Sequence, residues 1–483
     1  MRARTSTAAS AALALAVALA ASAAAAPPDR TRPPALGAPP ALTLPRVQTR
    51  TLPNGLELGV VEMHETPVVH VTLIVRAGSV CDPADLPGLA TFTANMLDEG
   101  AGGRGALAVS DAFEFLGAQF SASASRENAT LTLHVPKRQF AAAFDLMADV
   151  VLRPDFPDSE IVRQRELRKN QLLQLRDQPT AISPIAFNAV VFGASHPFGR
   201  PGGGTDASTE ALTRARVVEF WRRWYRPGHA RMLVVGDVTP SEAAALVRKR
   251  FGAWARGAVA APEVPAAPAP GPRAIHLVDK PGAAQSVVRI GHAGVARNHP
   301  DHYPLLVMNT ILGGSFTSRL NTNLRETHGY TYGARSSWDW GRWAGPFAAF
   351  ASVQTAKTDS ALIEFMKELR RIRDEGVPAA ELDKAKSYIA LGLPGSFETT
   401  SDVASQFAAL WSNDLPLDTY DQYLPKIMAV TAADVQRVAR AHIDPDRLAI
   451  VIVGDRKEIE PGLARLGEGP IVHRDLWGAE ARP

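Results

Sequence analysis

An internal duplication is the feature that most constrains how this chain folds. The apolar pattern MLVVGD (232–237) ends in Gly-Asp, and so does LAIVIVGD (448–455), with Gly454 lying 218 residues after Gly236. The same offset matches the apolar positions of two helical patterns: Phe144, Met147 and Val151 with Leu362, Phe365 and Leu369. The same offset aligns a strand pattern and a helical pattern that lie far apart in the sequence, which indicates a repeated domain.

Each copy combines strand and helix patterns. Apolar residues predict strands at 68–75 and 128–135, and Asn54-Gly55 marks the turn of a hairpin. Helical spacing predicts helices over 88–97 and 360–375. We therefore expect an α+β fold of two homologous domains, each an antiparallel sheet with helices packed on one face.

Composition marks the boundaries of these domains. Arg2 and Arg4 precede an Ala/Leu/Val run that ends in four alanines, which is typical of a secretory signal peptide. A later Pro/Ala-rich stretch without periodicity predicts a semi-rigid linker. The expected parts are, in order, a signal peptide (1–26), a Pro/Ala-rich lead-in (27–44), an N-terminal domain (45–256), the linker (257–272) and a C-terminal domain (273–470).

Charge and cysteine content exclude several classes of protein. Lys and Arg number 52 against 49 Asp and Glu, and no basic cluster points to nucleic acid. After the leader, no stretch reaches about 18 apolar residues without charge, so we expect no membrane span. The single cysteine, Cys81, has no internal disulfide partner and is expected to be a small buried side chain.

Residues 312–338 carry the candidate binding chemistry. Gly313 and Gly314 let a ligand approach the main chain closely. Arg325 offers a planar guanidinium suited to a carbonyl or carboxylate, and Tyr332 offers a phenol that can stabilise charge developing on a carbonyl oxygen. Together they predict a surface that holds a peptide, with no nucleophile or metal-ligand set among them.

The chain resembles the pitrilysin/insulinase family of inverzincin metallopeptidases, in particular its smaller two-domain subunits that work in pairs. The resemblance covers about residues 45–460. The matching segments, in order, are the NGL hairpin, GLATFTANML, LRPDFPDSE, HPFGRP, DKPGAAQS and LGGSFTSRLNTNLRE. Each segment alone is weak, and it is their order and spacing that carry the resemblance.

Active members of that family bind zinc through His-x-x-Glu-His on a helix, where the glutamate activates water. Here the two histidine places hold Thr91 and Asn95, and the place of the general base holds Ala94. The family's third ligand, a carboxylate on a later helix, corresponds to Gln171. Thr, Asn and Gln are poor zinc ligands beside imidazole and carboxylate, and Ala94 cannot take a proton. We expect a structural helix over 88–97 and no metal cofactor in this chain.

No other zinc site is expected. The twelve histidines include no pair four residues apart. His299 and His302 are the closest pair, and with Asp301 we interpret them as a solvated helix start. His328 lies inside the stretch 312–338, where a ligand contact and a plain surface position both stay open.

In the C-terminal domain the resemblance implies a retained second site. Catalytic relatives use an Arg and a Tyr seven residues apart to hold the substrate and stabilise the tetrahedral intermediate, and Arg325 and Tyr332 match them. A local ion pair is the plain alternative for the arginine. Gly313 and Gly314 match a family loop implicated in substrate handling, or simply end a helix; Tyr330 either contacts substrate or packs.

These features predict the zinc-less subunit of an exported heterodimeric metallopeptidase, periplasmic or secreted. A sister subunit would bring the zinc, and this chain would contribute Arg325 and Tyr332 to a closed chamber for unfolded or short peptides. The alternative is a catalytically inactive scaffold or peptide-binding protein of the same fold. An independent zinc peptidase would need a ligand set that the sequence does not reveal.

Overall fold

The computed structural model describes residues 43–481. The predicted signal peptide and nearly all of the predicted lead-in lie outside the described residues. From Leu44 onward the chain forms one compact unit. In the described part, no helix is both long and apolar enough to cross a membrane.

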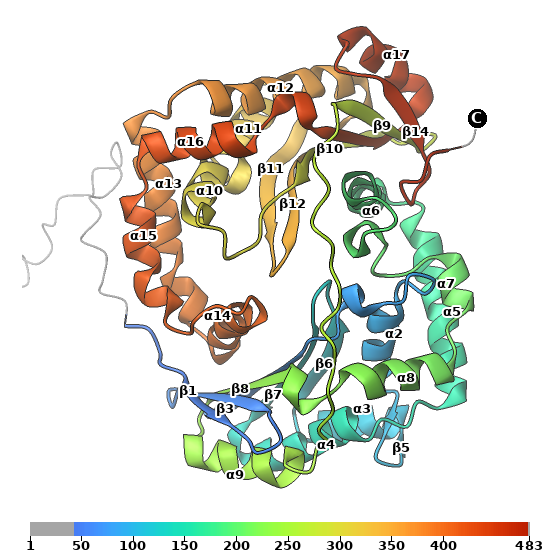
Figure 1. The fold of residues 1–483 in the computed structure, drawn as a ribbon, viewed down its shortest axis with the longest axis vertical. Helices are drawn as coiled ribbons and strands as arrows, with labels where there is room; N and C mark the ends of the chain where they lie inside the picture. The colour runs from blue at the N-terminus through green and yellow to red at the C-terminus, as the bar shows by residue number, and fades with distance from the viewer. Residues whose placement is uncertain (1–42, 482–483) are drawn as a thin grey trace, which may run out of the picture. The chain divides into compact units, whose positions relative to one another are not determined.

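Two six-stranded sheets form the framework of the fold (Figure 1). The N-terminal sheet has the order β1-β2-β8-β3-β7-β6, and the C-terminal sheet has the order β14-β9-β13-β10-β12-β11. The first consists of β1 (Gln48–Thr51), β2 (Glu57–Glu62), β3 (Val68–Val75), β6 (Gln119–Ala124), β7 (Ala129–Pro136) and β8 (Ala230–Gly236). The second consists of β9 (Ala274–Asp279), β10 (Gln285–Ala293), β11 (Thr331–Trp340), β12 (Ala344–Gln354), β13 (Ala449–Gly454) and β14 (Ile471–Arg474).

The two sheets share one topology, which confirms the predicted duplication. In each, the strand that ends in Gly-Asp lies at the centre, parallel to the first long strand of its half and antiparallel to the next. The expectation of antiparallel sheets is therefore wrong at the pairs β2–β8, β9–β13 and β9–β14, which are parallel. β8 and β13 reach the sheet only after a long helical crossover, which is the connection that parallel strands require. The edges differ, because β1 is antiparallel to β2 whereas β14 is parallel to β9.

Helices of each half pack on one face of its own sheet, as predicted, with the exception of α6 and α14, which pack on the sheet of the other half. The N-terminal half contains α2 (Leu89–Asn95), α3 (Ala106–Phe115), α4 (Phe140–Leu152), α5 (Asp158–Leu175), α6 (Pro179–Phe192), α7 (Asp206–Glu210), α8 (Arg214–Trp224) and α9 (Pro240–Phe251), with a short hairpin β4 (Gly100–Ala101) and β5 (Arg104–Gly105). The C-terminal half contains α10 (His302–Asn309), α11 (Arg319–Asn321), α12 (Thr358–Asp374), α13 (Ala379–Gly392), α14 (Thr400–Ser412), α15 (Tyr423–Ala429), α16 (Ala432–His442) and α17 (Arg456–Leu466). The apolar faces of α4 and α12, read from the sequence, lie in the cores of their halves.

The second face of each sheet is covered by a helix from the other half of the chain. α6 lies on β10 and β13 of the C-terminal sheet, and α14 lies on β3 and β8 of the N-terminal sheet (Figure 1). The apolar residues that meet under α6 are Ile182, Ala186, Phe187, Val278, Val451 and Val453. Strands such as β13 are apolar at successive positions, so both of their faces must be buried.

An ion cluster around Asp414, just beyond α14, also joins the halves. The backbone of Asp414 has φ 54°, a left-handed conformation that Asp tolerates better than most residues. Arg231 Nη1 lies 3.1 Å from Asp414 Oδ1, Arg342 Nη1 lies 3.7 Å from Oδ2, and Arg76 is paired with the same carboxylate. Arg76 and Arg231 belong to the N-terminal half, whereas Arg342 lies in the β11–β12 turn.

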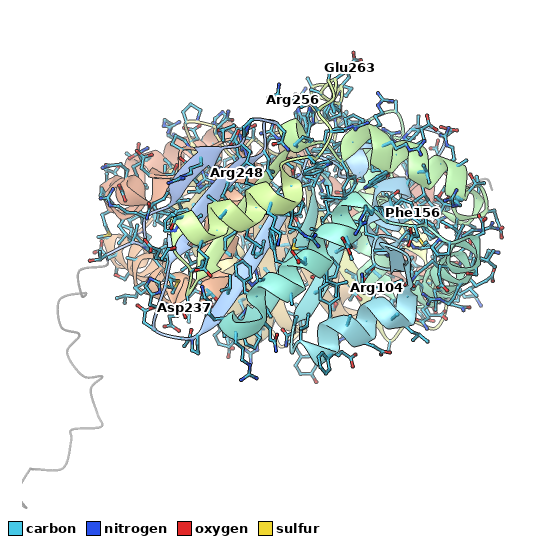
Figure 2. The ribbon with its side chains drawn as sticks, turned by 90° about the horizontal axis from the view of Figure 1, so that it is seen from below. Arg104, Phe156, Asp237, Arg248, Arg256 and Glu263 are labelled. Atoms are coloured by element: carbon cyan, nitrogen blue, oxygen red, sulfur yellow. The ribbon has the colours of Figure 1, made fainter. Side chains whose placement is uncertain are left out.

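The stretch between α9 and β9, which includes the predicted linker, contains no helix or strand and is attached to the N-terminal half. Val259, Val264 and Ala267 pack against that half's core. The side chains of His229 and His196 lie 3.1 Å from the carbonyl oxygens of Val259 and Pro265. Figure 2 shows Glu263 of the linker, and Arg256 just before it, at the surface.

The single cysteine also fits its predicted role. Cys81 is buried, and burial raises the pKa of its thiol to about 12. A thiol held in the protonated form is a poor nucleophile.

Because each sheet is covered on its second face by a helix from the other half (the helix exchange), we expect that neither half folds well alone. A fragment of residues 273–483 would lack α6 and expose the apolar face of β10 and β13, so it should self-associate; co-expression with residues 44–256 should restore a monodisperse complex. Size-exclusion chromatography with light scattering measures this. A monomeric 273–483 fragment that melts at the temperature of the full chain would contradict it.

Candidate functional site

Helix α2, which carries the positions expected to be degenerate zinc ligands, packs in the core of the N-terminal half. It spans Leu89–Asn95, slightly shorter than predicted, and Leu89, Phe92 and Ala94 on it are buried. The hydroxyl of Thr91 donates a hydrogen bond to the carbonyl of Gly202 at 2.8 Å, so it serves the neighbouring loop. Asn95 is the last residue of the helix and is half-buried.

The later helix, α5, brings a positive charge to α2. Gln171 is exposed, whereas Arg168, one turn earlier, is buried; its guanidinium lies 6.0 Å from the centre of the Phe92 ring and donates to the carbonyl of Gly203. Burial lowers the pKa of Arg168, and Asp82 opposes that shift. A cation beside α2 repels a metal ion, which adds to the loss of ligands at this place.

Strands β6 and β11 are equivalent edge strands of the two sheets. They differ in the contacts made by the main-chain groups that face away from the sheet. On β11, the amide of Ala334 donates to Asn321 Oδ1 at 3.1 Å, and the carbonyl of Ser336 accepts from Asn309 Nδ2 at 3.1 Å. Side chains of its own half thus occupy the edge of β11. Along Gln119–Ala124, within the described part of the chain, the strand β6 has hydrogen bonds from the main chain only to β7.

The chain from 310 to 327 consists of two short π-helical segments joined by a loop and the single turn α11. Gly313 is buried, and a Cβ there would overlap the main chain of Ser336 on β11. Gly313 is therefore required for the close approach of this segment to the strand. Gly314 is exposed, and of the two glycines it is the one open to a ligand.

A buried ion pair anchors this segment and was missed by sequence reasoning. Arg319 is 6% exposed, and its Nε and Nη2 donate to the two carboxylate oxygens of Glu381 on α13 at 2.9 and 2.7 Å. Asn323 donates at 2.8 Å to both Glu364 and Glu368 on α12. Burial raises the pKa of Glu364, but hydrogen bonds from Asn323 and Lys367 outweigh it and leave the pKa lowered. Nothing in the local spacing of these residues marks them as partners.

Arg325 lies at the end of the anchored segment. Its guanidinium lies 4.6 Å from the centre of the ring of Phe316, which is 67% exposed. Its Nη1 is 3.3 Å from Glu326 Oε1, so the local ion pair considered as the plain alternative is present. Surface pairs of this kind contribute little free energy and exchange readily for a ligand.

Tyr332, on β11, is 91% exposed, so its phenol is open to solvent. It is connected to Arg325 through a closed turn, in which the amide of Tyr330 donates to the carbonyl of Leu324 at 2.9 Å. Tyr330 itself packs against the core and stacks on His328 with 5.0 Å between ring centroids. The structure thus presents Arg325 and Tyr332 on either side of one turn.

The structure does not join these residues to the degenerate positions on α2 and α5. No hydrogen bond or ion pair between described residues links Arg325 or Tyr332 with Thr91, Asn95 or Gln171. The Arg/Tyr pair belongs to the C-terminal half and the degenerate helix to the N-terminal half.

One expectation about the histidines is wrong. His302 does not lie at a solvated helix start: it is buried against Trp340, with 4.4 Å between ring centroids. Burial lowers the pKa of His302 to about 3. Asp301 does precede α10, but it is mostly shielded from solvent and lies beside His442.

The duplicated fold, with an equivalent edge strand in each half, indicates the class to which the chain belongs. Residues 60–192 match the family model of insulinase (peptidase family M16), and residues 211–389 match that of the peptidase M16 inactive domain. The chain belongs to the M16 insulinase family, and it resembles the family's zinc-less subunits.

Known relatives span nearly the whole protein. An uncharacterized zinc protease of Mycobacterium tuberculosis is 29% identical over 427 residues, which cover 86% of this chain and 95% of the relative. A probable mitochondrial-processing peptidase subunit beta of Schizosaccharomyces pombe is 23% identical over 85% of this chain and 92% of the relative. The crystal structure of a peptidase M16 inactive domain from Pseudomonas fluorescens superimposes with a TM-score of 0.79 at 27% identity, covering 85% of this chain and 98% of that one.

The replaced ligands on α2 and the buried Arg168 predict that the purified chain alone cleaves no peptide, with or without added zinc. Loss of the general base alone typically costs 10²–10⁴ in rate, and here the metal ligands are replaced as well. A digest of a peptide library followed by mass spectrometry measures this. Cleavage by the isolated chain that a chelator abolishes would be the contrary result.

Proposed function

We propose that this chain is the zinc-less subunit of an exported heterodimeric M16 metalloendopeptidase. The observation that carries the proposal is the presentation of Arg325 and Tyr332 at the surface by a segment that Arg319 anchors to α13. A chain without metal ligands on α2 has no use of its own for a site that stabilises an oxyanion. A sister chain with His-x-x-Glu-His would supply the zinc.

In the pair, Arg325 and Tyr332 would act on the carbonyl of the scissile peptide bond. Their donors would strengthen their hydrogen bonds as the carbonyl oxygen becomes an oxyanion, and this lowers the barrier rather than tightening ground-state binding. Arg325 would exchange its contact with Glu326 for the substrate, while Phe316 supports the guanidinium plane. Gly314 lies on the same segment and Tyr330 in the turn that follows it, where peptide binding would involve them as well.

The proposal predicts specific kinetic losses. Arg325→Ala or Tyr332→Phe should leave assembly intact and lower kcat by about 10²–10³, with a smaller effect on KM. The double variant should lose less than the product of the single losses, because both donors serve one oxyanion. Steady-state kinetics on the reconstituted pair, with assembly checked by gel filtration, measure this.

Matched controls come from the same half. Arg335→Ala removes an exposed cation from β11, and Tyr388→Phe removes an exposed phenol from α13; both should keep the activity. Full activity in both Arg325→Ala and Tyr332→Phe would favour the second candidate function.

That second candidate is a catalytically inactive peptide-binding or scaffold protein. The open edge of β6, beside α2, favours it, because an extended peptide can add to a free sheet edge without any metal. The edge of β11 is already occupied by Asn309 and Asn321, so addition is restricted to the N-terminal sheet. Peptide binding without turnover in every pairing with a zinc-bearing sister chain would support this function.

We also propose that the mature chain is exported and begins near Ala26, in accord with the leader pattern of residues 1–26. N-terminal sequencing of fractionated protein should find this terminus in the periplasmic or secreted fraction. An intact Met1 in the cytoplasmic fraction would refute export.

A further inference from the structure

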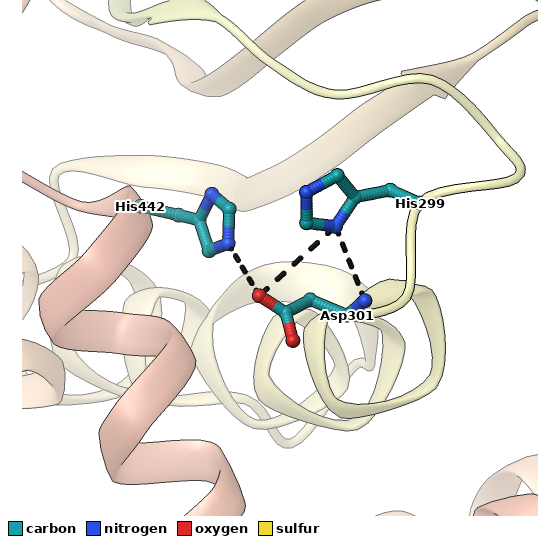
Figure 3. Close-up of side chains that lie close together, drawn as sticks. All are labelled: His299, Asp301 and His442. Carbon is teal, nitrogen blue, oxygen red and sulfur yellow. Dashed lines mark hydrogen bonds and ion pairs between the residues drawn. The ribbon is translucent and has the colours of Figure 1, made fainter.

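Side chains of types that commonly bind metals lie together at a place far along the sequence from α2. His299 and Asp301, in the turn before α10, meet His442, the last residue of α16 (Figure 3). One possible ligand atom from each of the three lies within 4.8 Å of the others. All three residues are only partly exposed. We propose that this cluster is a binding site for one divalent cation of the zinc class, held by two imidazoles and one carboxylate.

The lone pair on His299 is the first argument for a cation. The amide of Asp301 donates to His299 Nδ1 at 3.1 Å, so this nitrogen carries no proton. The same nitrogen lies 4.0 Å from Asp301 Oδ2, which is also an acceptor. An imidazole nitrogen has one lone pair, so a cation bound at Nδ1 would displace the hydrogen bond from the Asp301 amide and would bond to both Nδ1 and Oδ2.

The distances suit a small adjustment around an ion. His442 Nε2 lies 2.9 Å from the same carboxylate oxygen, Asp301 Oδ2. Tetrahedral zinc with bonds of about 2.0–2.2 Å to nitrogen and oxygen separates its ligand atoms by roughly 3.3 Å. Opening the His442 contact and closing the His299 contact, each by less than about 1 Å, brings both carboxylate contacts to that separation. The two imidazole nitrogens, which lie within 4.8 Å of each other, must close to the same separation. The ion would take the place of the proton that His442 shares with Asp301, and water would complete the shell.

Arg437 orients the carboxylate from the other side. Its Nη2 donates to Asp301 Oδ1 at 2.8 Å, which leaves Oδ2 directed at the two imidazoles. Partners that hold the second oxygen of a ligating carboxylate are a regular part of metal sites. Arg437 also balances the charge of Asp301, so the cation must draw its affinity from the imidazoles and from the geometry.

The site has an entry path from solvent. His299 lines a surface pocket together with three carboxylates, Asp418, Asp421 and Asp434, and with two cations, Arg297 and Lys426. The side chains of Asp301 and His442 are each 15% exposed, so water reaches them but bulk solvent does not surround them. Partial shielding of this kind strengthens bonds to a cation.

The position of the cluster connects it to the segment of Arg325. α10 leads directly into the π-helical segment Thr310–Gly314, and the ring of His442 lies 6.2 Å from that of Trp338 on β11. A bound ion would therefore tie α16, the base of α10 and the strand that carries Tyr332. This inference does not depend on the proposed catalytic role of the Arg/Tyr pair, and it revises the expectation of a metal-free chain for this cluster only.

Calorimetric titration of chelator-treated full-length protein with Zn²⁺ tests the proposal. We expect one ion per chain with a Kd in the micromolar range or below. His299→Asn keeps an acceptor for the amide of Asp301, and His442→Gln keeps a donor for its carboxylate, so both should fold; each should weaken binding at least about tenfold. His473→Asn is the control, because His473 contacts Glu460 at 2.9 Å without a second imidazole, and it should bind as the wild type does.

Two further measurements keep the result unambiguous. Thr91→Ala combined with Asn95→Ala should leave the affinity unchanged, which separates this site from α2. Co²⁺ added to the wild-type protein should give the visible absorption of a four-coordinate ion at one equivalent, and this readout needs no variant. A zinc Kd weaker than about 1 mM, or equal affinity in His299→Asn, His442→Gln and the wild type, would overturn the proposal.

Discussion

Each sheet of this protein depends on a helix that the opposite half supplies. Ile182 and Phe187 of α6 are buried against strands of the C-terminal sheet, and burial of a side chain of that size stabilises by about 1.5–3 kcal/mol. α14 covers the N-terminal sheet in the same way, and the arginines around Asp414 hold the C-terminal end of α14 in place. The duplicated domains therefore act as one folding unit, on which the placement of every surface site rests.

The difference between the two edge strands decides what each half can do. Asn309 and Asn321 occupy the edge of β11, and this capping holds the segment 310–327 against the strand. The same contacts, with Arg319 and Glu381, present Arg325 next to the exposed Tyr332. The equivalent edge of β6 has no such cap in the described structure, so an extended chain can pair there. The two halves thus share a fold but present different surfaces, an occupied sheet edge at β11 and an open sheet edge at β6.

Electrostatics separates the degenerate helix from the cluster at α10. On α5, the buried Arg168 brings a positive charge to α2, where relatives place a metal and its ligands. At α10, Arg437 is also present, but it binds the outer oxygen of Asp301 and leaves two imidazoles and one oxygen directed at a common point. A nearby cation would repel a metal in the first case, whereas in the proposed site it would orient a ligand, because the donor atoms differ.

The sequence alone determined the duplication, the α+β class and the core faces of α4 and α12. It also predicted, through the family resemblance, the replaced zinc ligands at Thr91, Ala94, Asn95 and Gln171 and the candidate pair Arg325 and Tyr332. These are local patterns, or matches in order and spacing, and they need no knowledge of distant contacts. Only the tertiary structure decided the helix exchange, the parallel strand pairs, the Arg319–Glu381 anchor and the meeting of His299 with His442. Those features join residues far apart in the chain, more than 300 positions for α14 and β3, and their side chains become neighbours only when burial of both sheet faces fixes the path of the chain.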